Sequence, residues 1–474
     1  MRRSPCCFIS LCILLSPALS AQSHDIVIDG RMDDWKEVSP LIQYPETGPG
    51  NTLRLKGLWL ADDDTYLFIR FELDREILLQ ENNGLALYLD IDGKGATGDL
   101  AGAEIAFNFG ERKGWIQDGE ESLPIEYEAL DLYSAPSTFS ASFEISISWK
   151  AHPWLEALGF GYHTLGIMLF DKSAKEILCH SLYRPSLQPR PPYILTTLGK
   201  AAPDHVRLVT HNVNKRHFLP DKKEAFSRVY GALDPDILLL EEAYDGNAGE
   251  ILDYFREALG PSETWYAAKE GAEATVVLSR YPVTTVCALG NSAAYLIDLR
   301  PERETELALV VLSMPCCRED SARQAEADQI AAFVRDWQLP GTPGRLAPGT
   351  PIVLAGDANL VGPLEQLLTL TEGAIRDTTA YGQGLGPDWD GSSFADLCPL
   401  QLQRPVAATW RGKGFSPSRL DYILYSDYVL KIGRRFVFDT GGLTPELLRK
   451  YGLHPTDGPA TYKHMPVVAD LIFR

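Results

Sequence analysis

The apolar pattern of this chain changes once, near residue 205, and the change divides the chain into two parts. Before that point the apolar runs are short and bounded by Asp, Asn and Gly, which is typical of β-strands. Clear examples are Asp64–Glu72, Leu85–Asp90 and Phe143–Trp149. Long helical periodicity is scarce here, so residues 24–182 are predicted to form an all-β sandwich of antiparallel strands.

From residue 206 onward, strand-like runs alternate with amphipathic helical segments. Such alternation indicates strands and helices stacked in layers, so residues 205–474 are predicted to form an α/β domain. The residues Thr-Pro-Glu at 444–446 place an N-cap and a proline where a short helix should begin. The predicted strands are Val206–His211, Ile237–Leu240, Thr275–Leu278, Ala308–Leu312 and Ile352–Ala355, and the predicted helices are Lys222–Leu233, Ile251–Leu259 and Arg323–Trp337.

Residues 183–204 join the two parts and contain five prolines. Proline has no N–H to donate to a ladder of strands, so this segment is predicted to be a linker. A length of 474 residues also favours two domains, because single hydrophobic cores stop growing well below that size.

The first 21 residues have the features of a signal peptide. Arg2 and Arg3 precede an apolar stretch, Phe8–Leu15, and small residues follow at 18, 20 and 21. A membrane anchor is the alternative, but the stretch is too short to cross a bilayer comfortably. The mature protein is therefore predicted to be secreted or periplasmic, with no stable membrane insertion.

The formal net charge of −20 is strongly acidic, and loss of residues 1–21, which hold two arginines and no acid, would make it −22. Such a charge repels polyanions, so nucleic acid is a disfavoured partner, although a local basic groove would override this. Five of the eight cysteines lie beyond residue 21, and an odd number implies no complete disulfide framework. They are Cys179, Cys287, Cys316, Cys317 and Cys398.

Six polar residues in the second part come at or just after apolar, strand-like runs. Oxygen ligands, amides and one imidazole suit a Mg²⁺-assisted attack on a phosphoester, because Mg²⁺ is usually held by one or two carboxylates plus substrate oxygens. No Cys/His group with zinc spacing competes with them. Taken singly, each residue also fits a strand end, a turn or a buried structural histidine. The six are Asn212, Glu242, Asp357, Asn359, Asp421 and His464.

The segments that hold these residues occur in an order that resembles the endonuclease/exonuclease/phosphatase superfamily over residues 205–474. The resemblance implies a four-layered α/β sandwich with its active site at one edge of two packed sheets. The segments are His211–Asn214, Leu240–Glu242, Leu278–Pro282, Ala355–Asn359, Ser418–Tyr422 and His464–Val468.

The resemblance also implies roles for the residues. Glu242 would be the principal ligand of Mg²⁺ or Mn²⁺, with Asn212 beside it as a metal or phosphate ligand. Asp357 would orient or deprotonate the attacking water, and Asn359 would hold the phosphate or that water. The chemistry of phosphoryl transfer agrees, because it needs positioning and neutralisation of oxygen charge.

Near the end of the chain, Asp421 would fix the tautomer of His464, which would donate to a phosphate oxygen. The chain departs from the family where Lys463 replaces the Asp that usually precedes this histidine, and residues 310–315 lack the family's usual His or Tyr. Lys463 is expected to weaken metal binding or to contact the substrate phosphate. Arg419 is a second predicted substrate contact, unless it forms an ion pair with Asp421.

In the first part, three segments together resemble family-nine carbohydrate-binding and DOMON-like β-sandwiches. The resemblance implies a carbohydrate or surface ligand for this domain. Asp90, Asp92 and Asp99 supply oxygens at loop spacing that would suit Ca²⁺, but a hairpin turn rich in Asp and Gly explains them equally well. The three segments are Ile28–Trp35, Ala61–Phe68 and Asp90–Gly98.

The predicted function is an exported, divalent-metal-dependent phosphoesterase that hydrolyses a phosphodiester or a phosphomonoester by attack of an activated water. An extracellular nuclease is an alternative within the same chemistry. A non-catalytic surface or glycan-binding protein with a degenerate hydrolase domain is a third hypothesis. Substrate specificity is expected to come from loops such as 244–250, 338–350 and 380–415.

Overall fold

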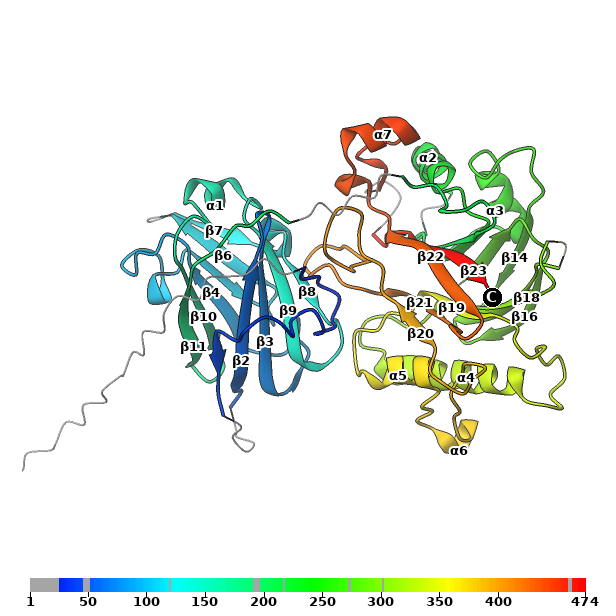
Figure 1. The fold of residues 1–474 in the computed structure, drawn as a ribbon, viewed down its shortest axis with the longest axis horizontal. Helices are drawn as coiled ribbons and strands as arrows, with labels where there is room; N and C mark the ends of the chain where they lie inside the picture. Colours follow the sequence, from blue (N-terminus) through cyan, green and yellow to red (C-terminus); the bar gives the residue numbers. More distant parts are fainter. Residues whose placement is uncertain are drawn as a thin grey trace, which may run out of the picture.

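The computed structural model describes residues 25–45, 52–118, 121–190, 197–215, 218–271, 274–300, 302–458 and 463–474. The predicted signal peptide and part of the predicted linker lie outside these residues. Two domains lie side by side, each with its own sheets and apolar cores (Figure 1). Strand β11 (Glu176–Tyr183) is the last of the first domain, and β12 (Val206–Asn212) is the first of the second.

The N-terminal domain is a sandwich of two antiparallel sheets, as predicted. The strand order is β1-β2-β3-β9-β8 in one sheet and β11-β10-β4-β5-β6-β7 in the other. A short helix, α1 (Pro153–Ala157), follows β9. The remaining strands are β1 (Ile42–Gln43), β2 (Leu55–Asp62), β3 (Tyr66–Ile77), β4 (Leu85–Asp90), β5 (Ile105–Asn108), β6 (Lys113–Asp118), β7 (Glu121–Ile125), β8 (Tyr133–Ala135), β9 (Ser140–Ser148) and β10 (Leu165–Asp171).

Alternate side chains of these strands meet between the two sheets. On β3 they include Leu67, Ile69 and Phe71, and on β4 they include Leu87 and Leu89, all fully buried in one core. The period of two in the sequence places each set on a single face of its sheet. Burial of each such side chain stabilises the fold by about 1.5–3 kcal/mol relative to exposure.

The C-terminal domain contains two six-stranded sheets, which pack face to face across a shared apolar core. The strand order is β14-β15-β13-β12-β23-β22 in one sheet and β16-β17-β18-β19-β21-β20 in the other. The strands are β13 (Ile237–Glu241), β14 (Tyr266–Glu270), β15 (Thr275–Ser279), β16 (Val283–Leu289), β17 (Ser292–Asp298), β18 (Glu306–Ser313), β19 (Ile352–Asp357), β20 (Ala395–Leu397), β21 (Asp421–Tyr425), β22 (Leu430–Val437) and β23 (Val467–Phe473).

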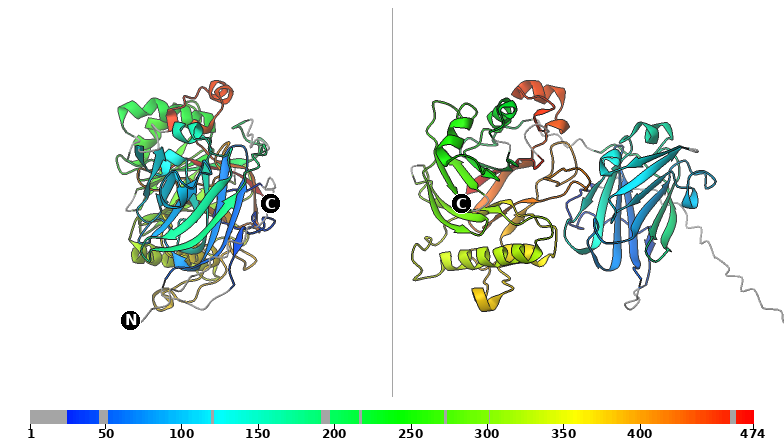
Figure 2. Two further views of the ribbon diagram at one scale, coloured as in Figure 1. Left: turned by 90° about the vertical axis from the view of Figure 1, so that its left-hand side faces the viewer. Right: turned by 180° about the vertical axis from the view of Figure 1, so that it is seen from behind.

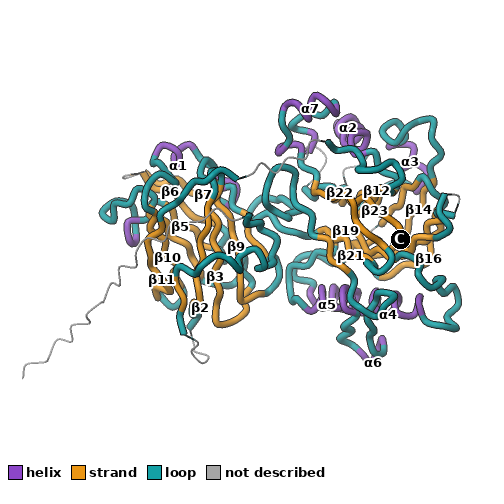
Figure 3. Tube along the Cα trace, in the orientation of Figure 1, coloured by secondary structure: helices purple, strands orange, loops and turns teal. Residues whose placement is uncertain are grey.

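Helices cover the outer face of each sheet, so the layers run helix, sheet, sheet, helix, as Figures 2 and 3 show from several sides. The sheet that contains β12 is covered by α2, α3 and α7, and the sheet that contains β19 is covered by α4 and α5. The predicted four-layered sandwich is thus confirmed. The helices are α2 (Lys223–Leu233), α3 (Ala248–Phe255), α4 (Asp320–Gln338), α5 (Glu365–Glu372), α6 (Thr378–Tyr381) and α7 (Pro445–Tyr451).

The central strand β13 shows why its sequence is continuously apolar. Leu238 and Leu240 pack into the core beneath the helices, whereas Ile237 and Leu239 pack into the core between the two sheets. A strand that is buried on both faces needs no polar alternation. The polar residues Glu241 and Glu242 come directly after this apolar run.

One helix begins and ends earlier than predicted. The expected helix Ile251–Leu259 is α3, which spans Ala248–Phe255. Its start is fixed by a capping box, in which Asn247 and Glu250 each accept a hydrogen bond from the other's backbone N–H. The sequence contained this signal, and the apolar periodicity alone gave the wrong boundary. Helix α7 begins where predicted, and the hydroxyl of Thr444 caps it.

The two domains share a small apolar core. Ile28 and Trp35 of the sandwich are buried in one cluster with Val406 and Ala408 of the C-terminal domain. Polar contacts add to it, since the Tyr133 hydroxyl accepts a hydrogen bond from Arg404 Nη1 at 2.6 Å. The sandwich is therefore docked against the C-terminal domain by packing as well as by the linker.

One ion pair in the C-terminal domain is completely buried. Arg207 donates from Nε and Nη2 to the carboxylate of Asp470 at 2.7 and 3.0 Å, and neither side chain is exposed. Its Nη1 donates to the carbonyl oxygens of Leu198 and Leu233 at 2.6 and 2.8 Å. These bonds compensate the desolvation of the charges, so either charge left alone would be costly.

The variant Arg207→Met should lower the free energy of unfolding by about 3–5 kcal/mol, because it leaves the Asp470 charge buried without a partner. Urea denaturation followed by circular dichroism measures this. The double variant Arg207→Met/Asp470→Leu should recover much of the loss. Equal stability of the single variant and the unmodified chain would show that the pair is not buried as described.

Candidate active site

The six predicted polar residues all lie at one edge of the two packed sheets. Asn212 ends β12, Glu242 directly follows β13, and Asp357 ends β19. Asp421 begins β21, and His464 precedes β23 by three residues. The sheet topology brings them together, because β12 and β13 run parallel while β19 and β21 run antiparallel, with Asp357 paired opposite Asp421.

Asn212 is fully buried and lies between two carboxylates. Its Nδ2 donates to Oε1 of Glu242 at 3.2 Å and to Oδ2 of Asp357 at 2.9 Å. Its Oδ1 accepts a hydrogen bond from the backbone N–H of Asn214 at 2.8 Å. As arranged, this amide bridges the carboxylates through its nitrogen, which cannot ligate a cation, so the predicted role as a metal ligand would need the amide to turn.

Two residues of the site have a left-handed backbone that non-glycine residues rarely adopt. Glu242 has a φ of 53° and Asn359 a φ of 49°. Asn359 Nδ2 donates to Oδ2 of Asp357 at 3.0 Å and to the carbonyl oxygen of Met314 at 2.9 Å. Unusual backbone of this kind persists only where the surroundings enforce it, and here it aims both side chains at the cluster.

His464 and Asp421 form a buried pair. Nδ1 of the imidazole lies 3.1 Å from both carboxylate oxygens of Asp421, and Nε2 lies 3.8 Å from Oδ2 of Asp357. The hydroxyl of Thr409 donates to Oδ2 of Asp421 at 2.6 Å and accepts the backbone N–H of the same residue. The ring orientation is therefore fixed, with Nε2 facing the second carboxylate.

The charges of this cluster shift its protonation. Burial acts to lower the pKa of His464, but the carboxylates of Asp421 and Asp357 outweigh it and raise the pKa to about 9. Burial raises the pKa of Asp357 to about 7, against the opposing effect of the imidazolium. Burial likewise holds the pKa of Glu241 well above its ordinary range, with the charges of Asp421 and Asp357 adding to the effect. The cluster thus places the His464 imidazole between the carboxyl groups of Asp421 and Asp357, with the buried carboxyl of Glu241 close enough to interact with both.

Sequence reasoning missed two residues that hold the cluster. Thr409 anchors Asp421, and it lies in a loop whose sequence carries no recognisable signal. Glu241 is fully buried and accepts a hydrogen bond from the Thr210 hydroxyl at 2.7 Å. Its place inside an apolar strand, directly before Glu242, was the available signal.

Lys463 is exposed directly beside the buried His464, and its backbone carbonyl accepts the N–H of Arg411 at 2.9 Å. This position is compatible with either predicted role of the lysine, so both remain predictions. No ion pair or side-chain hydrogen bond of Lys463 occurs with the part of the chain that the structure describes.

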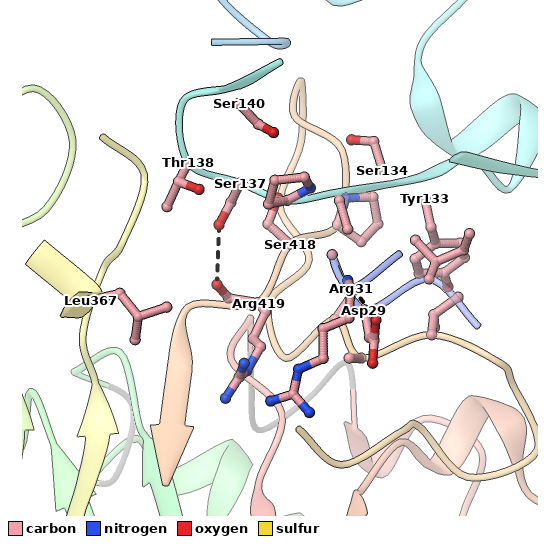
Figure 4. Close-up of a pocket in the computed structure, with 18 of the residues that line it drawn as sticks. Asp29, Arg31, Tyr133, Ser134, Ser137, Thr138, Ser140, Leu367, Ser418 and Arg419 are labelled. Carbon is pink, nitrogen blue, oxygen red and sulfur yellow. Dashed lines mark hydrogen bonds between the residues drawn. The ribbon is translucent and has the colours of Figure 1, made fainter. Parts of the chain in front are cut away.

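The structure does not bring Arg419 to the cluster, contrary to the predicted substrate contact. Its guanidinium forms two bonds with the carboxylate of Asp396 and stacks on the ring of Tyr422, 3.9 Å from the ring centre. The alternative ion pair with Asp421 is also wrong. Arg419 and Arg31 instead line a cavity of about 220 Å³ between the two domains (Figure 4). The Asp396 carboxylate forms ion pairs with both arginines.

The donor set of the cluster fits a hard divalent cation. Asp357, Asp421 and His464 each offer a ligand atom within 4.8 Å of the others, and Glu242 adds a partly exposed carboxylate. Because Nδ1 of His464 is engaged by Asp421, a cation would be held chiefly by carboxylate oxygens of Glu242 and Asp357. These residues therefore suit Mg²⁺ or Mn²⁺ better than a softer metal.

The predicted calcium ligands in the N-terminal domain are only partly brought together. Asp90 and Asp92 cluster with Glu104, each offering an oxygen within 4.8 Å of the others, whereas Asp99 is exposed and lies outside the group. The Glu104 carboxylate also accepts the hydroxyl of Thr97 at 2.9 Å. Glu104 was missed because it lies on the far side of the loop in sequence. A Ca²⁺ site here stays a prediction.

Residues 209–444 match the sequence model of the Endonuclease/Exonuclease/phosphatase family. The C-terminal domain belongs to this family. Its members hydrolyse phosphoesters, and many use divalent metals. The match contains Asn212 through Asp421 and ends before His464, so the histidine is placed in the site by the geometry alone. The match begins after the N-terminal domain and does not include it. The resemblance of that domain to carbohydrate-binding sandwiches stays a prediction.

Solved structures similar to this chain include other members of the family. A family protein from Leptotrichia buccalis is 12% identical and covers 56% of this chain and 100% of its own, with a TM-score of 0.36. The human Nocturnin catalytic domain is 15% identical and covers 60% of this chain and 100% of its own, with a TM-score of 0.35. A mannosyl-6-phosphatase from Bacteroides thetaiotaomicron is 14% identical and covers 56% of this chain and 100% of its own, with a TM-score of 0.35. No curated protein matches the chain.

Every helix in the described residues is too short or too polar to cross a bilayer.

The variant Asp421→Asn should lower the pKa of His464 from about 9 toward its ordinary value of 6.5, because it removes the nearest negative charge. Titration of the labelled imidazole by NMR measures this. Asp328→Asn is the matched control, since Asp328 is a buried carboxylate elsewhere that accepts backbone N–H groups. An unchanged His464 pKa in Asp421→Asn would contradict the pairing described here.

Proposed function

We propose that this protein is an exported, divalent-metal-dependent phosphoesterase that hydrolyses a phosphodiester or phosphomonoester by attack of an activated water. The observation that carries the proposal is the arrangement of His464 between Asp421 and Asp357, 3.1 and 3.8 Å away, beside the accessible carboxylate of Glu242. Family membership of the domain supports the same reaction class. Export rests on the predicted signal peptide.

In the proposed reaction, Asp357 orients the attacking water and accepts its proton. Asn212 and Asn359 donate hydrogen bonds to that carboxylate, at 2.9 and 3.0 Å, and hold it in place. Nε2–H of His464 faces the same space and donates to a non-bridging oxygen of the phosphate. Developing negative charge on that oxygen is thereby stabilised, which is the main demand of phosphoryl transfer.

Glu242 and Asp357 are the residues that would hold a Mg²⁺ or Mn²⁺ ion. Such an ion supplies charge neutralisation at the phosphate oxygens and lowers the pKa of water. Asp421 and His464 are both buried, so little water reaches them. The electrostatic interaction between their charges is therefore stronger than it would be in water. The strongly acidic chain favours a small or lipid-like phosphoester over a nucleic acid.

Replacement of either reacting residue should abolish most of the turnover. Asp357→Ala and His464→Ala should each reduce the rate with a generic phosphodiester or phosphomonoester by about two orders of magnitude or more. Rates of the purified mature chain are measured with Mg²⁺, with Mn²⁺ and with EDTA, and EDTA should suppress them. Plasmid DNA in the same panel tests the nuclease alternative. Equal rates in the variants would mean that the activity has another origin.

Reversal of the charge at Lys463 should tighten binding of the cation. The variant Lys463→Asp should lower the Mg²⁺ concentration needed for half-maximal rate by about tenfold, because two units of charge change close to a divalent ion. Lys431→Asp is the control, since Lys431 is also exposed but lies on β22 opposite Ile472, near the end of β23 that is far from His464. An identical Mg²⁺ dependence in all three proteins would mean that Lys463 lies outside the field of the ion.

A further inference from the structure

Two adjacent cysteines lie on the loop between β18 and α4. Cys316 and Cys317 are free thiols, and both residues are exposed. Their Sγ atoms are 2.6 Å apart, which is much closer than ordinary non-bonded contact between sulfur atoms. The other cysteines of the described chain are buried or partly buried. This is therefore the accessible thiol pair of the described protein.

The thiol pair lies beside the proposed active site. Just before the pair, the N–H of Met314 donates to the carbonyl oxygen of Asp357 at 2.9 Å, and its carbonyl accepts Nδ2 of Asn359. Desolvation and the Cys317 thiol raise the pKa of Cys316 to about 12, and the charges of Asp357 and Glu242 add to the effect. The Cys316 thiol therefore lies within electrostatic reach of both carboxylates.

The loop is held in the conformation that brings the thiols together. Cys317 has a φ of 61°, in the left-handed region that residues other than glycine seldom adopt. Arg323, a buried residue of α4, donates to the carbonyl oxygens of Pro315 and Cys317 at 2.5 and 3.3 Å. The helix thus fixes the backbone on both sides of Cys316, and the approach of the two sulfur atoms is built into the fold.

We propose that Cys316 and Cys317 close to a reversible vicinal disulfide by exchange with a low-molecular-weight disulfide, and that closure slows the reaction at the neighbouring carboxylates. The first part stands on the thiol geometry alone. The second part rests on the proposed phosphoesterase function.

The exchange proceeds in two balanced steps. The thiolate of Cys317 attacks one sulfur of oxidised glutathione, the glutathione S–S bond breaks, and the released glutathione thiolate takes up a proton. Cys316 then gives its proton to solvent and attacks Cys317 Sγ, and the second glutathione leaves as a thiol. Two protein thiols are oxidised, and one glutathione disulfide is reduced to two thiols.

The disulfide is expected to be easily reduced again. Adjacent Cα atoms are about 3.8 Å apart across a trans peptide, which is below the range of about 4.4–6.8 Å usual for disulfides. Strained and exposed disulfides are the labile ones. Closure also replaces two S–H groups by an S–S bond next to the segment that holds Asp357 and Asn359. The effect on the rate is expected to be small, on the scale of one ordinary hydrogen bond.

Mass spectrometry of the intact mature chain after incubation with oxidised glutathione tests the first part. The unmodified chain should lose two hydrogen atoms at Cys316 and Cys317 and retain no glutathione there, and dithiothreitol should reverse the change. Cys316→Ser should instead keep one glutathione on Cys317, and Cys287→Ser should behave like the unmodified chain. A stable glutathione adduct on the unmodified pair, or two thiols that stay free, would overturn the proposal.

Rates before oxidation, after it and after re-reduction test the second part. The oxidised chain should be about fivefold slower, and the double variant Cys316→Ser/Cys317→Ser should not respond to glutathione. A rate that oxidation leaves unchanged would overturn the coupling of the pair to the site. A chain that forms the disulfide but is inactive in both states would count against the phosphoesterase function, and the mass measurement would stand apart from it.

Discussion

The pairing of β19 with β21 places two carboxylates opposite one another at the edge of a sheet, and the site depends on that constraint. Asp357 and Asp421 are register partners, and both are buried. Like charges in this position repel unless a cation lies between them. His464 supplies that cation, since its two ring nitrogens face one carboxylate each. The charged imidazole is therefore a consequence of strand register as much as of residue identity.

The surrounding residues keep the charge of this cluster in balance. Glu241 is adjacent to Glu242 in the chain, but it is fully buried, and burial raises the pKa of its carboxyl well above the ordinary range. Glu242 keeps a partly exposed carboxylate, with its backbone in a left-handed conformation. Two neighbouring glutamates thus differ in exposure, and the partly exposed carboxylate at this strand end is the one available to a cation.

The N-terminal domain contacts the segments that support this cluster. Residues 404–418 meet the sandwich through Arg404 and through Ser416, whose N–H donates to Gln80 at 2.8 Å. The same stretch contains Thr409, which anchors Asp421. In the loop between β18 and α4, Arg318 forms an ion pair with Glu81 of the sandwich at 3.1 Å. The sandwich therefore contacts both the stretch that contains Thr409 and the loop that follows β18.

The sequence by itself determined the two domains, the class of each and the positions of four of the six residues at or just after the end of a strand, because apolar periodicity and polar residues after strands are local properties. Asp421 instead begins a strand and His464 precedes one. It also identified the polar set of the site, through the order of its motifs. Only the tertiary structure decided which charges meet. Arg419 pairs with Asp396, Glu104 replaces Asp99, and Thr409 anchors Asp421, and each of these contacts joins residues distant in the chain. Pairings of this kind depend on how strands and loops pack against one another, which no local pattern encodes.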